Sequence, residues 1–508
     1  MNRYFLIPLI LILMWSQVLV SPELVDIDAQ FIMRYLDQVE DLHRYFNDLV
    51  SLKTIDLQPI RDLSLWIDLK IFKTFDINLI VLHNFLLWLL CLYFLYTILA
   101  KIDVDKKNIS IFIILWVGTH PVLSNIVPWG MARKHLLSCL FILCCTSIMV
   151  RQGFDQRQKS IFSLYLLSNL SQPINLFWPF WCWIKDRRIY FSLALGLIFL
   201  GGVNYFYYLK SPIMLSIFGG KFSEPLAFSD LLLAFGHYGF QIIFPYLLSV
   251  NYSLGHWSSF LGIIFWVTLV FFIYKKKDWI WLIFALLPLV IVLRKPTSLY
   301  DTYLLVTLVG LGIILFKHLS ISKIFFGLVI FINVIFSFFY SAHWKSETEL
   351  ARVSFNNRPS CISATEYLIA QYSNARVSDD KTALNFLLSH ECTLNKNFQR
   401  LQLVRNYILY YEDIYSLEQR EKFLIEMMPR NFMSEVILAG FYLKTGMSSK
   451  ADIILKKLSL EMNPKNLVAE YEPVIKNSLY PYCTQKPELG CKELMAKFIV
   501  KQKSIFYR

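Results

Sequence analysis

Two short groups of charged residues have the types and spacing needed for proton transfer and for anion binding. Asp26 and Asp28 form an Asp-Ile-Asp sequence shortly after the first hydrophobic run. An acidic side chain at the end of a membrane helix can act as a general base toward a hydroxyl group. The pair also fits solvated charge at a helix end, because Glu23 lies nearby.

The second group lies in Thr119–Ser138, a polar stretch interrupted by prolines between two hydrophobic runs. Arg133 and Lys134 can bind an anion such as a lipid phosphate there. The alternative is that both reach toward lipid headgroups at the start of a helix. His120 fits either a hydrogen bond at a helix end or a contact to a substrate.

A third candidate, Asp301, starts a later hydrophobic run shortly after Arg294 and Lys295. It fits an ion pair with one of these cations, and direct catalysis is the alternative.

The composition indicates a membrane protein. Charged residues make up 17% of the chain and mean hydropathy is +0.47, whereas soluble chains carry about a quarter charged residues. The net charge of +13 does not indicate nucleic-acid binding, because the cations cluster between hydrophobic runs. That distribution is typical of cytoplasmic loops, and it is seen at 106–107, 151–159 and 275–277.

The chain contains about eleven hydrophobic runs that fit transmembrane helices. We expect an all-α polytopic membrane domain over 1–343, with the N-terminus cytoplasmic and a large, partly helical first external loop over 21–76. The runs are 4–20, 77–100, 109–121, 134–150, 161–184, 189–209, 231–249, 257–274, 279–294, 298–316 and 322–342.

One run conflicts with this charge pattern. If 161–184 crossed the membrane once, the cations that follow it would lie on the external side, whereas Lys and Arg concentrate on the cytoplasmic side. These cations are Lys185, Arg187 and Arg188. Pro173 and Pro179 make a broken or hairpin segment an alternative.

Residues 344–508 predict a soluble helical domain on the external side. Within it, 432–464 has the spacing of two antiparallel helices, typical of a tetratricopeptide unit, although a small irregular helical domain is the alternative. An even number of cysteines in this tail fits disulfides in an oxidising compartment. The simplest pairing joins Cys361 to Cys392 and Cys483 to Cys491. The other five cysteines lie in hydrophobic runs and are expected to be core residues.

Ordered short motifs resemble one family: multi-pass glycosyltransferases of the GT-C type that use polyprenyl-phosphate sugars and end in tetratricopeptide repeats. The stretch 119–138 matches the family's most specific motif at His120, Pro121, Val127, Trp129, Arg133, Lys134, Leu137 and Ser138. Other similar stretches are Gln58–Ser64 with Asp68, His83-Asn84, Gln172-Pro173 with Pro179 and Asp186, Pro245 with Leu248 and Tyr252, and Asp301 with Tyr303 and Gly310.

The chain departs from the family at four charged positions. Asn125 replaces a Glu, Gln58 and Thr302 replace Arg residues, and Gln172 replaces a Lys. The acidic pair, usually adjacent, is separated by one residue at Asp26 and Asp28.

The resemblance implies transfer of a sugar from a polyprenyl-phosphate carrier, with inversion, on the external face of a bacterial inner membrane. The acceptor would be a hydroxyl group of a protein or glycolipid. Asp28 or Asp26 would be the base, and Arg133 and Lys134 would hold the donor phosphate. His120, Asn125, Arg61, His83 and Asp301 would line the site. No metal is obligatory, although a divalent ion stays open. Membrane lipids surround the domain, and the tail would bind a protein partner.

Two other functions fit the same sequence. One is a membrane scaffold that keeps the fold, has lost catalysis and binds partners through its tail. The other is a lipid or solute transporter, against which the spans show no internal repeat and few charges.

Overall fold

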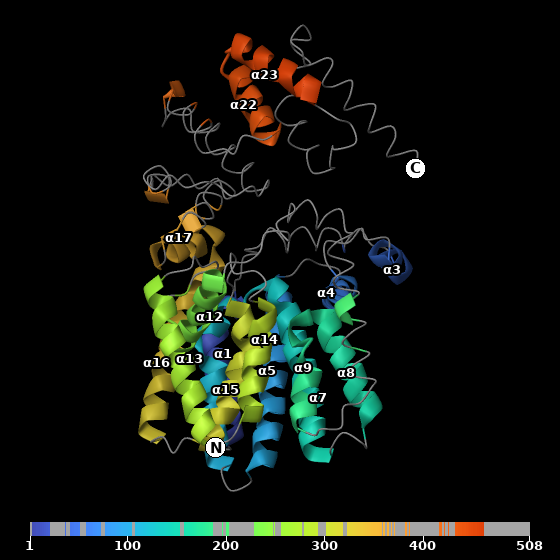
Figure 1. Ribbon diagram of the computed structural model, residues 1–508, viewed down its shortest axis with the longest axis vertical. Coiled ribbons are helices and arrows are strands. Elements are labelled where there is room, and N and C mark those ends of the chain that lie inside the picture. Colours follow the sequence, from blue (N-terminus) through green and yellow to red (C-terminus); the bar gives the residue numbers. More distant parts are fainter. Residues whose placement is uncertain are drawn as a thin grey trace. The chain divides into compact units, whose positions relative to one another are not determined.

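The computed structural model describes two compact units, Met1–Arg358 and Pro359–Arg508 (Figure 1). Helices are the only regular secondary structure in the described ranges. The described residues are 3–20, 41–50, 57–72, 77–103, 107–152, 157–185, 228–246, 256–276, 279–292, 301–318, 323–357 and 432–461, with isolated positions between them. Asp26, Asp28 and the four tail cysteines lie outside the described residues.

Each predicted hydrophobic run contains a helix, apart from 189–209, most of which lies outside the described residues. The helices are α1 (Arg3–Val20), α5 (Ile77–Ile102), α6 (Lys107–Thr119), α7 (Arg133–Gln152), α8 (Gln158–Ser171), α9 (Trp178–Lys185), α12 (Phe228–Ile243), α13 (His256–Lys276), α14 (Trp279–Val292), α15 (Leu304–His318) and α16 (Lys323–Ser341).

Four described stretches are long and apolar enough to cross a membrane: Asn78–Ile102, Gly130–Arg151, Trp257–Lys276 and Ile324–Lys345. Their outward faces stay apolar. On α5, for example, Leu82, Leu86 and Leu90 are each more than 40% exposed. Soluble proteins rarely leave apolar stripes of this length in water. The first unit is therefore an all-α unit with the features of a membrane protein.

Several helices end in basic residues at the same end of this unit. Arg133 donates to Asn84 near the starts of α7 and α5, and the Thr97 and Ser147 hydroxyls lie 2.8 Å apart near their ends, so the two helices run parallel. His135 and Tyr303 pack ring to ring near the starts of α7 and α15, and the Phe272 ring packs on His318 near the ends of α13 and α15. The basic residues in the last turns are Lys101, Arg151, Lys275, Lys276 and Lys317.

The short helices gather at the other end (Figure 1). These are α4 (Pro59–Phe72), η1 (Pro121–Asn125), η2 (Gly130–Ala132), η3 (Pro173–Asn175), η5 (Asp301–Tyr303), η6 (Ala342–Lys345) and α17 (Glu347–Asn357), with α3 (Leu42–Val50) beside α4. Lys345 donates to Gln17 Oε1 at 2.5 Å, so α1 and α16 end together. The start of α1 and α17 therefore lie at opposite ends of the first unit.

The predicted run 161–184 is broken. α8 ends at Ser171, Pro173 starts η3, and α9 begins at Trp178. The rings of Tyr165 and Trp178 stack at 6.1 Å, whereas one continuous helix would separate them by about 20 Å. The chain therefore turns back. Cys182 then contacts Met149 near the end of α7, so α9 returns toward the basic end.

The cysteines of the hydrophobic runs belong to the core, as predicted. Cys91, Cys139, Cys145 and Cys182 are buried among the apolar side chains of the first unit, and Cys144 packs against them.

In the second unit, α22 (Phe432–Lys444) and α23 (Ser448–Glu461) form a pair of contacting helices. Gly446 has a φ of 78°, a conformation in which glycine avoids the Cβ clash. Its N–H donates to Leu443, and the N–H of Met447 donates to Tyr442, which ends α22 in a Schellman motif. Ala439 and Ala451 are fully buried. Whether this helix pair is a tetratricopeptide unit stays a prediction.

Candidate functional site

Helix α4, in the stretch before α5, has polar side chains on its buried face. Helical periodicity places Gln58, Arg61, Asp62 and Asp68 on the same side of α4 as Leu65 and Leu69. All six side chains are buried. Because α4 contacts α7 and α8, its polar face meets the bundle and must be satisfied by partners within the protein.

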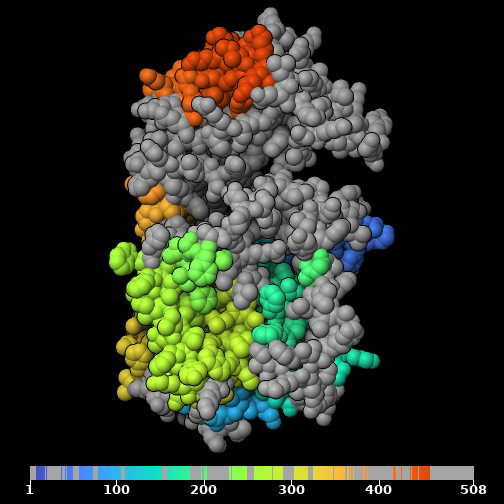
Figure 2. Space-filling model, in the orientation of Figure 1, coloured from blue at the N-terminus to red at the C-terminus, as the bar shows by residue number. Residues whose placement is uncertain are grey.

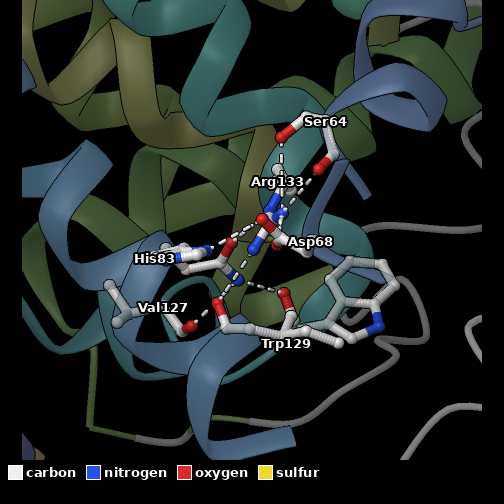
Figure 3. Close-up of polar contacts among 8 residues, drawn as sticks. Ser64, Asp68, His83, Val127, Trp129 and Arg133 are labelled. Carbon is white, nitrogen blue, oxygen red and sulfur yellow. Dashed lines mark hydrogen bonds and ion pairs between the residues drawn. The ribbon is translucent and has the colours of Figure 1, made fainter. Parts of the chain in front are cut away.

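Asp68 forms a buried ion pair with Arg133, the first residue of α7 (Figure 3). Arg133 is 1% exposed. Its guanidinium also donates to Asn84 Oδ1 at 3.1 Å, to Ser64 Oγ at 3.3 Å and to the Ile80 carbonyl at 3.1 Å. A substrate phosphate that approached Arg133 would therefore compete with these protein acceptors.

His83 shares the same carboxylate. Its Nδ1 lies 3.0 Å from Asp68 Oδ1, and its side chain is 28% exposed. A carboxylate at Nδ1 fixes the orientation and tautomer of an imidazole. Asp68 can therefore hold the His83 imidazole in a fixed orientation at the end of the bundle where α4 lies.

Asn84 holds the stretch between η1 and η2. Its Nδ2 donates to the Val127 carbonyl at 3.2 Å and to the Trp129 carbonyl at 3.0 Å, while its Oδ1 accepts from Arg133 (Figure 3). This single amide positions the loop that precedes α7.

A second polar group on α4 lies about two turns nearer its start. Arg61 pairs with Asp62 at 2.6 Å and donates to Gln58 Oε1 at 2.8 Å, and Tyr45 donates to Asp62 Oδ2 at 2.9 Å. Gln58 Nε2 donates to Gln172 Oε1 at 2.7 Å. Gln58 and Gln172, which stand where the motifs of the resembling family have cations, therefore hydrogen-bond to each other.

His120 and Asn125 lie at the two ends of η1. The His120 Nδ1 accepts from the Val122 N–H at 3.4 Å, which is the role of a helix cap. Its Nε2 lies 3.3 Å from the Ile242 carbonyl. Tyr340 donates to Asn125 Oδ1 at 3.1 Å.

η1 also contacts η5, which Asp301 begins and which contains Thr302. Asn125 and Thr302 stand where the motifs of the resembling family have residues of opposite charge, and both side chains are buried. The two substitutions therefore fall on contacting elements.

Lys134 follows Arg133 in the first turn of α7 and is partly exposed. It is thus the more accessible member of the predicted basic pair.

The structure brings some predicted residues together and leaves others apart. Arg133 and His83 meet at Asp68, and Arg61 lies on the same face of α4. His120, Asn125 and the start of η5 form a neighbouring group, with no hydrogen bond to Asp68 among the described contacts. Asp68, Asn84, Ser64 and Gln172 lie in the stretches that resemble family motifs, but the sequence assigns them no role in the site. The helical spacing of polar residues along α4 is the signal that points to them.

No group of three His, Cys, Asp or Glu side chains able to hold a metal occurs within the described part of the chain.

Comparisons of the whole chain with protein-family models, curated proteins and solved structures find no match.

Proposed function

We propose that the protein is a membrane glycosyltransferase of the GT-C type. It would move a sugar from a polyprenyl-phosphate carrier to a hydroxyl group of a protein or glycolipid. One observation carries this proposal. The stretches that resemble family motifs, far apart in sequence, converge on one polar cluster around Asp68 and Arg133.

This convergence supports the proposal because the resemblance rests on the linear order of the motifs, whereas the contacts join residues far apart in sequence. Asp68, His83-Asn84 and Arg133 come from three such stretches, and they share hydrogen bonds. Gln58 and Gln172 come from the first of these stretches and from a fourth, and they form another.

The cluster lies at the end of the first unit opposite the basic helix ends (Figure 1). Lys and Arg concentrate on the cytoplasmic side of membrane proteins. The proposal therefore puts the site on the external face of the inner membrane, with the N-terminus cytoplasmic and the tail external.

Within this proposal, Asp28 or Asp26 removes the proton of the acceptor hydroxyl. Lys134, the accessible cation, contacts the donor phosphate, while Arg133 positions Asp68, His83 and the loop before α7. A phosphate leaving group needs neutralisation of its charge more than protonation, so no metal is obligatory.

The test is transfer of sugar from a lipid-linked donor in membrane vesicles. Asp26→Asn combined with Asp28→Asn is expected to abolish transfer, and Lys134→Ala to weaken use of the donor. Lys159→Ala, an exposed cation at the start of α8, is the matched control. Unchanged transfer in the double Asp variant would refute the catalytic assignment.

A second candidate, a scaffold without catalysis, is favoured by the neutral Gln58–Gln172 contact where the family carries two cations. A deletion strain with a normal profile of glycoproteins and glycolipids would support the scaffold. So would partners that still co-purify with the Asp26→Asn/Asp28→Asn variant.

The tail is proposed to recruit the acceptor protein through a repeat-like helix pair, with its four cysteines in disulfides. An impermeant thiol reagent applied to intact spheroplasts is expected to label the tail only after reduction. The core cysteines are buried or half-buried in the membrane unit and should stay unlabelled. Labelling without reductant would exclude the disulfides, and labelling only in inverted vesicles would exclude an external tail.

A further inference from the structure

An apolar hollow of about 390 Å³ lies on the outer surface of α13, between α12 and α14. Its walls include Phe235, Trp266, Val270, Phe271, Tyr274 and Trp279. The side chains of α13 and α14, yellow-green in Figure 2, cover much of the face turned to the viewer.

One end of the hollow is closed and the other lies beside cations. Trp266 stacks on Phe235 at 5.0 Å and donates to its carbonyl at 2.9 Å. At the other end, Lys275 lies 4.5 Å from the centroid of the Phe271 ring, and both Lys275 and Lys276 are exposed.

The length of the hollow matches one leaflet of a membrane. Trp266 and Tyr274 are eight positions apart on α13, which corresponds to about 12 Å along the axis. The hydrocarbon core of one leaflet is about 15 Å deep. Tyr274 and Trp279 would then lie at the interface, where aromatic residues concentrate, and Lys275 would lie at headgroup level.

The charge at this end extends beyond α13. The ring contact between Phe272 and His318 brings the last turn of α15, with Lys317, to the same end of the bundle. A zwitterionic headgroup balances its own phosphate, whereas a net negative headgroup gains about 1 kcal/mol for each nearby Lys or Arg.

We infer that the apolar hollow on α13 is a binding site for an anionic glycerophospholipid. An acyl chain lies against the aromatic wall, and Lys275 and Lys276 hold the headgroup. The site lies at the end opposite the Asp68–Arg133 cluster, so it does not depend on the proposed transferase activity. Lysines are also favoured at helix C-termini by the helix dipole, so the test must measure lipid selectivity rather than stability.

The full-length protein is reconstituted with a photoactivatable phosphatidylglycerol or phosphatidylcholine that carries the reactive group in its acyl chain. Cross-linked peptides spanning 266–279 are then quantified by mass spectrometry. We expect the anionic lipid to predominate. Lys275→Gln with Lys276→Gln should reduce that preference by about fivefold per lysine.

Two further variants distinguish lipid binding in the hollow from a general attraction of anionic lipids to exposed cations. Val270→Trp, at a partly exposed position in the wall, should fill the hollow and reduce cross-linking of both lipids. Arg157→Gln with Lys159→Gln removes two exposed cations at the start of α8 and should leave the preference unchanged. Equal cross-linking of the two lipids by the wild type, or an unchanged preference in the Lys275/Lys276 variant, would overturn the inference. Displacement of the anionic lipid by equimolar polyprenyl phosphate would overturn the assigned occupant.

Discussion

Asp68 and Arg133 form a buried ion pair across 65 positions of sequence, and it ties α4 to the first turn of α7. The pair also organises its surroundings, because Asp68 contacts His83 and Arg133 contacts Asn84. Helix α4 is therefore anchored to the bundle by charge as well as by apolar packing.

Breaking this pair from one side is expected to be costly. Asp68→Asn leaves the Arg133 charge buried without its counter-ion, which should lower the free energy of unfolding by about 3–5 kcal/mol. Combining Asp68→Leu with Arg133→Met should recover part of the loss. Thermal unfolding of the purified protein in detergent measures both effects. The control is Arg352→Gln, which breaks the exposed pair with Glu349 and should change stability by at most about 1 kcal/mol. A small effect of Asp68→Asn would mean that the pair is not needed for the fold.

The crossing of α12 and α13 depends on glycine. A Cβ on Gly262 would lie 1.6 Å from the Gly236 carbonyl oxygen and 2.5 Å from the Phe240 nitrogen. Gly262→Ala should therefore separate the helices and destabilise the protein by about 3 kcal/mol, at the upper end of overpacking costs. Gly327→Ala on α16 is the matched control, because its Cβ would meet no atom within 4 Å. There the alanine should be neutral or stabilising. Equal melting temperatures for the two variants would contradict the close crossing.

Asn125 and Thr302 are expected to be energetically coupled. Asn125→Glu alone puts an unpaired charge into the contact between η1 and η5 and should destabilise the protein. Adding Thr302→Arg supplies a counter-ion from the facing element and should restore part of the loss. A double-mutant cycle of unfolding measures the interaction energy, expected to be about 0.5–3 kcal/mol. Strict additivity would show that the two positions do not form a pair.

Glu421 should make the stability of the second unit depend on pH. The hydrogen bonds from Lys450, at 2.5 Å, and from Tyr442, at 2.7 Å, lower the pKa of Glu421 below its usual value. Its folded pKa is therefore lower than its unfolded pKa of about 4.3. The stabilisation is complete above the unfolded pKa and is lost as pH falls through the folded pKa.

The measurement compares the wild type with Glu421→Gln, because their difference in melting temperature isolates this carboxylate. We expect the difference at pH 7 to shrink on acidification below about pH 4. Glu418→Gln, at an exposed position nearby, is the control for removing a carboxylate from this part of the chain. A difference in melting temperature between the wild type and Glu421→Gln that stayed constant down to pH 3 would rule out the proposed contact.

The helix positions could be predicted because hydrophobic run length is a local property of the chain. Pro173 marked the break between α8 and α9 for the same reason, since a proline removes a helical hydrogen bond wherever it lies. The pairing of Arg133 with Asp68 could not be predicted this way. It depends on how α4 packs on α7, and sequence spacing carries no information about that contact.

The exposure of the basic pair Arg133 and Lys134 could not be predicted from the sequence either. Arg133 and Lys134 are adjacent in sequence, yet one is buried among acceptors and the other is partly exposed. Helical geometry turns successive residues by about 100°, so neighbours on α7 meet different surroundings. The sequence could indicate a cationic site but not which cation is accessible.

The hydrogen bond between Gln58 and Gln172 joins the start of α4 to the residue that ends α8. Neither amide titrates, and dissolved ions screen charges far more than they weaken a neutral hydrogen bond. This attachment of α4 to the end of α8 therefore does not depend on the protonation state of either residue.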